Sequence, residues 1–61
     1  MRSIGQKIMQ IEGLLGTRDV NIWEEEFIRR VIGLTDHGKK TVGLSEKQAR
    51  IIERIWGRHF A

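Results

Sequence analysis

The stretch LSEKQARIIERIWGRHF, residues 44–60, decides the fold because it predicts an amphipathic helix with a marked start. Its segment SEKQ fits a capping box, in which the side chains of Ser45 and Gln48 each accept a hydrogen bond from the other residue's backbone N–H. At about 100° per residue, apolar side chains gather on one side of this helix. They are Ala49, Ile52, Ile55, Trp56 and Phe60. The opposite side, which we call the cationic stripe, carries Lys47, Arg50, Arg54 and Arg58.

A second helix is predicted near the N-terminus, over about residues 3–15. Its apolar residues recur at helical spacing, and they are Ile4, Ile8, Ile11 and Leu15. Ser3 can cap the start of this helix, and Gly16 is placed to end it. Gly5 and Gly13 each weaken the helix by up to about 1 kcal/mol relative to alanine.

A third helix is predicted from Asn21, where NIWE repeats the capping pattern with Glu24. Its apolar stripe, widened by two isoleucines, consists of Trp23, Phe27, Ile28, Val31, Ile32 and Leu34. Gly33 is expected to end this helix. Residues 34–43, LTDHGKKTVG, then form a flexible basic loop, since they contain two glycines and two adjacent lysines.

These segments predict an all-α fold: a three-helix mini-bundle with a flexible basic loop between the second and third helices, in a single small domain, residues 1–61. Besides the isoleucines of the first helix, the expected core contains Trp23, Phe27, Val31, Ile52, Ile55 and Trp56. A chain of this length buries only about 60% of the surface it exposes when unfolded. Because it has no cysteine, helix packing or a partner must supply its stability.

Composition and charge narrow the classes of function. The formal net charge of +3 favours an anionic partner only mildly. No apolar run of about 18 residues is present, and the N-terminus lacks the apolar core of a secretory signal. We therefore expect a soluble, cytoplasmic protein without a membrane partner.

No catalytic or metal site is expected. The segment GLTDHGK, residues 33–39, matches the opening of a phosphate-binding P-loop, but Lys40 stands where Ser or Thr would hold magnesium. The strand that must precede a P-loop is also missing. His37 and His59 lie far apart and show no metal-ligand spacing. We expect no enzymatic activity, no cofactor and no metal.

The cationic stripe is the leading candidate site, for contact with the backbone of DNA or RNA. With two loop lysines added, the predicted nucleic-acid-binding residues are Lys39, Lys40, Lys47, Arg50, Arg54 and Arg58. Five engaged phosphates would make log K fall with log salt with a slope of roughly −4 to −5. The alternative is an ordinary solvated face on which pairs such as Glu46–Arg50 balance the charge. A standard helix-turn-helix does not fit, because the loop exceeds its three- or four-residue turn.

A protein-binding module is the rival hypothesis, for example an inhibitor that docks on a host enzyme or regulator. Its contacts would be the apolar end of the last helix, Trp56 and Phe60, or the acidic first turn with Glu24, Glu25 and Glu26. A third hypothesis is a homodimer that completes its core through Trp56 and Ile55.

The arrangement WEEEFIRRV, then a loop, then LSEKQARIIERIW resembles a motif in small accessory proteins of bacteriophages and prophages. In that motif a Trp-x-x-x-Phe helix precedes Leu-Ser/Thr-x-Lys-Gln and a helix rich in Ile and Leu. The resemblance covers a little over half of the chain and leaves out the first helix. It implies a mobile-element protein encoded near genes of DNA metabolism, and it transfers no catalytic residue.

Overall fold

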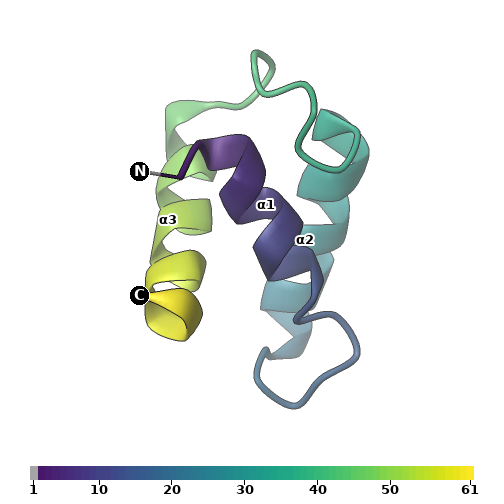
Figure 1. Cartoon of the computed structure of the whole chain (residues 1–61). Helices are drawn as coiled ribbons and strands as arrows, with labels where there is room; N and C mark the ends of the chain where they lie inside the picture. The colour runs from purple at the N-terminus through teal and green to yellow at the C-terminus, as the bar shows by residue number, and fades with distance from the viewer. Residues whose placement is uncertain (1) are drawn as a thin grey trace.

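A computed structural model describes residues 2–61 and contains three helices in that range, α1 (Ile4–Glu12), α2 (Ile22–Thr35) and α3 (Glu46–Phe60). Figure 1 shows α1 lying against both other helices, with α2 running opposite to α1 and α3. The backbones of α2 and α3 do not pack directly against each other within the described range. The predicted all-α three-helix mini-bundle is confirmed, and α1 is the element that joins the other two.

Each helix begins with a complete capping box, in which two side chains satisfy two backbone N–H groups. The three pairs are Ser3–Gln6, Asn21–Glu24 and Ser45–Gln48. In α3, for example, Gln48 N donates to Ser45 Oγ over 3.1 Å, and Ser45 N donates to Gln48 Oε1 over 2.9 Å. Short-range hydrogen bonding therefore fixes where all three helices start.

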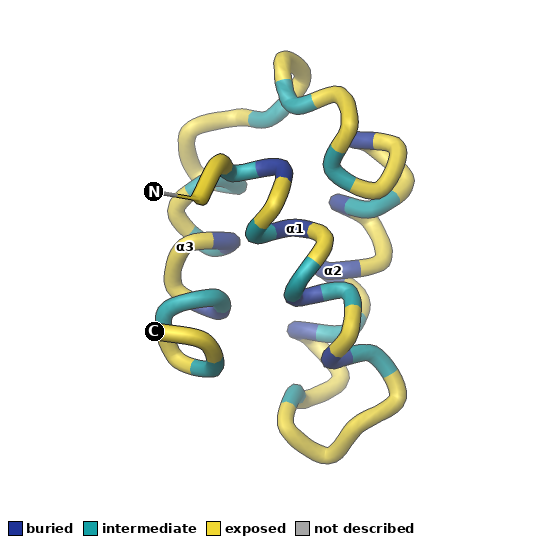
Figure 2. Tube along the Cα trace, in the orientation of Figure 1, coloured by how far each residue is buried: buried dark blue, intermediate teal, exposed yellow. Residues whose placement is uncertain are grey.

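The core lies where the three helices face one another, and Figure 2 shows the buried residues along their inner sides. Its members are Ile8, Ile11, Leu14, Phe27, Ile28, Val31, Ile52 and Ile55. Trp56 packs at the edge, half-buried, and its Nε1 donates to Gln10 Oε1 over 2.6 Å. The placement of Trp23 in the core was wrong, since this residue is 59% exposed. It lies on the flank of α2 where the backbones of α2 and α3 stay apart.

Two predicted helix ends were also wrong. Helix α1 ends at Glu12, capped by Gly13, and Gly16 with φ +79° belongs to the turn beyond it. Helix α2 continues through Gly33 to Thr35. It ends because Asp36, with φ 52°, adopts the left-handed conformation that usually falls to glycine at a C-terminal cap.

The first part of the predicted flexible loop is a hydrogen-bonded turn. Thr35, which is fully buried, donates from Oγ1 to the Val31 carbonyl over 2.7 Å and accepts from Gly38 N over 3.0 Å. This turn passes so close to α1 that a Cβ on Gly38 would lie 2.5 Å from the carbonyl oxygen of Gly5. A Cβ on Gly5 would collide with the Gly38 carbonyl oxygen in the same way. The two glycines therefore let α1 and the turn touch backbone to backbone.

Candidate functional site

A groove of about 400 Å³ opens between α2 and α3. It is lined by Trp23, Phe27, Arg30, Ser45, Lys47, Gln48 and Ile51. None of these residues belongs to α1, so the groove lies on a side of the bundle that α1 leaves uncovered. We call it the α2–α3 groove.

Two stacked aromatic rings form the α2 wall of the groove. Trp23 and Phe27 lie one helical turn apart, their ring centroids are 5.7 Å apart, and their planes differ by only 4°. Phe27 is buried, whereas more than half of Trp23 remains open to solvent. Packing on Phe27 thus holds the exposed indole in one orientation.

Two cations line the groove together with these rings. Arg30 follows Trp23 by seven residues on α2, and Lys47 lines the groove from α3. Arg54 follows Lys47 by seven residues and so lies on the same face of α3. Within residues 2–61, Arg30, Lys47 and Arg54 have no carboxylate partner. We call these three side chains the open cations.

The predicted cationic stripe is therefore divided. Lys47 and Arg54 are open, but Arg50 pairs with Glu46 over 2.6 Å and Arg58 pairs with Glu24. The first pair is exposed on both sides, and a pair of that kind contributes little. The second is different, because Glu24 is only 7% exposed and also accepts from Asn21 N over 2.9 Å. Arg58 thus joins α3 to the start of α2 and is not free for a ligand.

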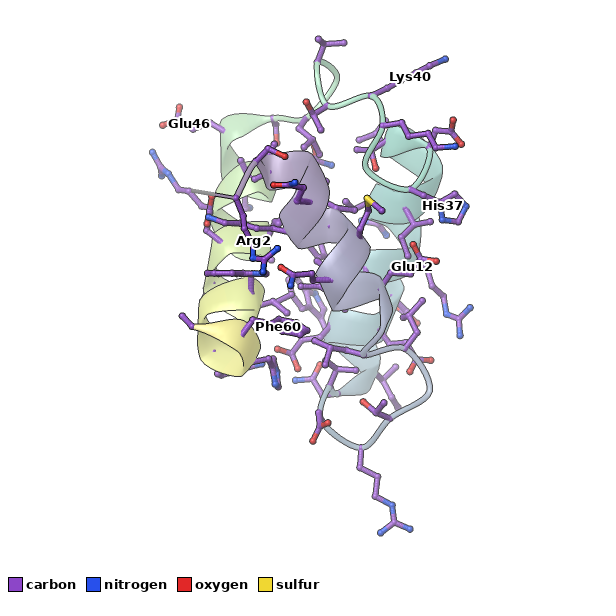
Figure 3. All side chains as sticks on the ribbon, in the orientation of Figure 1. Arg2, Glu12, His37, Lys40, Glu46 and Phe60 are labelled. Atoms are coloured by element: carbon purple, nitrogen blue, oxygen red, sulfur yellow. The ribbon has the colours of Figure 1, made fainter. Side chains whose placement is uncertain are left out.

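The two loop lysines do not extend the stripe. Lys39 and Lys40 are exposed in the segment after α2. Figure 3 shows Lys40 pointing outward on the α2 side, away from α3. Neither lysine is among the residues that line the groove, and the turn that begins at Thr35 holds the Lys40 backbone, whose N donates to the Thr35 carbonyl over 2.8 Å.

The predicted partner contacts at the end of α3 already have neighbours in the chain. Trp56 stacks on Phe60, with centroids 6.4 Å apart, and Lys7 Nζ lies 4.7 Å from the Trp56 ring. Lys7 also pairs with Glu53 over 2.6 Å, so this cluster fastens α3 to α1. Phe60 stays 41% exposed, whereas Ile55 is 2% exposed and offers no surface to a second copy.

The acidic first turn of α2 is largely neutralised. Besides the Arg58 pair of Glu24, the Glu25 carboxylate accepts from Gly16 N and from Arg29, each over 3.3 Å. Glu26 is exposed and lies beside Trp23 and Arg30 in a small side pocket. Of the predicted acidic contacts, only Glu26 is without an ion pair within the range that the structure describes.

The two histidines have different surroundings. His37 Nδ1 lies 3.0 Å from Glu12 Oε1, and Figure 3 shows the two side chains side by side. His59 belongs to α3, and its buried Nε2 has no partner in the described part of the chain. Residues 2–61 contain no cluster of three or more His, Asp or Glu side chains placed to hold a metal ion. No helix in this range has both the length and the apolarity to cross a bilayer.

Of the residues that line the groove, only Lys47 was predicted from the sequence as a site residue, and Trp23 and Arg30 are the missed residues that matter most for its chemistry. Their signal was present, because Trp23, Phe27 and Arg30 occupy positions i, i+4 and i+7 of α2, just as Lys47, Ile51 and Arg54 do on α3. Periodicity alone does not show that Trp23, Phe27 and Arg30 lie across one groove from Lys47 and Ile51. Comparison with known protein families, curated proteins and solved structures finds no match.

Proposed function

We propose that this chain is a non-enzymatic nucleic-acid-binding protein that holds the phosphate backbone with the open cations. The observation that carries the proposal is that Arg30 and Lys47 line one groove from two helices, and Arg54 lies one heptad beyond Lys47 on the same face of α3. None of the three makes an ion pair within residues 2–61. Cations left unpaired beside an aromatic wall suit a ligand with regularly spaced negative charges.

The spacing of the open cations supports a backbone ligand. Lys47 and Arg54 are seven residues apart, which is about 10 Å along the helix axis. Successive phosphates of one duplex strand are separated by roughly 3.4 Å along its axis, so this interval spans about three of them. Arg30 adds a contact from the opposite wall of the groove. Binding of this kind positions the protein on nucleic acid without reading its sequence.

The salt dependence of affinity tests the proposal. Three engaged phosphates give a slope of log K against log salt of roughly −2 for a single strand and −2.7 for a duplex. This is about half of the slope expected had the whole predicted stripe been available. Fluorescence anisotropy with a labelled oligonucleotide at several salt concentrations measures it. An affinity that stays constant across those concentrations would contradict the proposal.

Single charge removals separate the groove from the rest of the surface. We expect Arg30→Gln or Lys47→Gln to reduce the steepness of the salt slope by about 1 unit, since each removes one phosphate contact. The matched control is Arg18→Gln, an equal loss of charge at an exposed position between α1 and α2. Equal effects of Arg18→Gln and Arg30→Gln would mean that net charge, and not the groove, determines binding.

A protein partner is the second candidate, and the apolar part of the same groove favours it. Trp23 and Ile51 line a volume large enough for side chains of a docked helix. A pull-down from host lysate, performed with and without nuclease, distinguishes the two candidates. Partners lost on nuclease treatment support nucleic-acid binding, and a protein retained after treatment favours a docking module. The resemblance to bacteriophage accessory proteins is compatible with both and stays a prediction.

A further inference from the structure

The exposed indole of Trp23 is the feature of the groove that phosphate binding alone does not use. Trp23 is 59% exposed although a protein of this size has few large apolar side chains for its core, and its ring is held parallel to that of Phe27. Solvent exposure of a large aromatic ring gains nothing for folding. A ring fixed in one orientation, however, can stack a planar group with little loss of conformational entropy.

We infer that Trp23 is a stacking platform for an unpaired base, so that the ligand of the groove is single-stranded nucleic acid. This inference rests on the proposed function and specifies its ligand. Aromatic faces that stack bases, set among cations that follow the backbone, are the combination by which proteins hold single strands. The α2–α3 groove combines both, because Trp23 lines it together with Arg30 from the same helix and Lys47 from the facing helix.

The shape of the site favours a single strand over a duplex. The groove volume of about 400 Å³ falls within the range of sites for small organic ligands, roughly 300–1,000 Å³. An indole can stack only on a base that has left its neighbours, and the bases of an intact duplex are already stacked. A duplex could therefore reach the open cations but not the face of Trp23.

The side-chain amide of Gln48 is available to contact a base edge. Gln48 Oε1 accepts from Ser45 N in the capping box, and Gln48 N donates to Ser45 Oγ. The side-chain Nε2 of Gln48 has no acceptor among residues 2–61 and belongs to a residue that lines the groove. It can donate to a carbonyl of a stacked base, whereas the stacking itself tolerates any base.

Titration with oligothymidine of about 12 nucleotides, compared with a duplex of equal length at the same low salt, tests the inference. We expect the single strand to bind at least about tenfold more tightly and to quench tryptophan fluorescence. Trp23→Leu should weaken single-strand binding by about tenfold and leave duplex binding unchanged. Trp23→Phe, which keeps an aromatic face, should retain most of the affinity but lose most of the quenching. The matched control is Ile22→Ala, which removes a neighbouring side chain that is 80% exposed and outside the groove.

The outcomes separate this inference from the proposed function. If Arg30→Gln weakens binding while Trp23→Leu does not, phosphate binding stands and the stacking role is overturned. If neither strand form binds at low salt, both fall. If poly-glutamate of the same charge binds as tightly and quenches Trp23 equally, the groove is a site for acidic peptides and the inference is wrong. Circular dichroism of each variant shows whether the helices are retained.

Discussion

Replacing Gly5 by alanine tests the backbone contact between α1 and the turn after α2. On helix propensity alone, this change would stabilise α1 by about 1 kcal/mol. The structure reverses that expectation, because the new Cβ would overlap the carbonyl oxygen of Gly38. A backbone oxygen cannot rotate away as a side chain can. The turn that carries Gly38 is also held by Thr35, whose Oγ1 accepts from Gly38 N over 3.0 Å.

The expected change in the free energy of unfolding is the balance of the steric collision and the gain in helix propensity. Overpacking a well-filled contact costs roughly 1–3 kcal/mol, and a collision with backbone lies at the upper end of that range. After subtraction of the propensity gain, we expect Gly5→Ala to lower the free energy of unfolding by about 2 kcal/mol. A loss of 1 kcal/mol lowers Tm by about 4–8 °C in a domain of this size, so the expected fall exceeds about 8 °C.

Gly33→Ala is the matched control, since Gly33 lies inside α2 and an added Cβ would meet nothing within 4 Å. The same chemical change there should raise the free energy of unfolding by up to about 1 kcal/mol. Urea and thermal unfolding followed by circular dichroism measure both variants under two-state conditions. If Gly5→Ala is as stable as Gly33→Ala, the close contact of α1 with the turn does not exist in solution.

Two further substitutions test hydrogen bonds made by the buried polar side chains Glu24 and Thr35. Glu24→Ala should destabilise the fold by about 2 kcal/mol, because it removes both the acceptor of the Asn21 N–H and the partner of Arg58. The control Glu26→Ala, at an exposed position, should change stability by less than about 0.5 kcal/mol. Unfolding of both variants in urea measures the difference. Thr35→Val should lower the free energy of unfolding by about 1–2 kcal/mol, since Gly38 N loses its acceptor while the side-chain volume is kept. Thermal unfolding measures this loss, and an unchanged Tm would show that water replaces the hydroxyl.

Local sequence signals predicted the starts of the helices better than their ends. Starts depend on side chains that bond to backbone within three residues, as Ser45 and Gln48 do in α3. Ends were less predictable, because glycine is tolerated inside a helix and other residues adopt a left-handed cap. Helix α2 therefore continues through Gly33, and it is Asp36, with φ 52°, that forms the C-terminal cap.

The candidate site shows the same division. The outward side of α3 could be predicted from periodicity, and Lys47 and Arg54 do stay unpaired within the described range. That Arg58 pairs with Glu24, 34 residues away, could not be predicted, because no local rule connects two helix faces across a bundle. Trp23 was predicted in the core for the corresponding reason. An apolar stripe shows which face of a helix is hydrophobic, but it does not show how much of that face the neighbouring helices cover.

Local sequence patterns were enough to predict three amphipathic helices with capped starts and a positively charged outer face on the last helix. These properties depend on side chains within a few positions of one another. Only the tertiary structure decided which cations stay open, which carboxylates neutralise the others, and that α2 and α3 stand apart to leave a groove beside Trp23. Those features depend on where α1 sits, and its position is set by the backbone contact of Gly5 with Gly38 and by packing between residues distant in the chain.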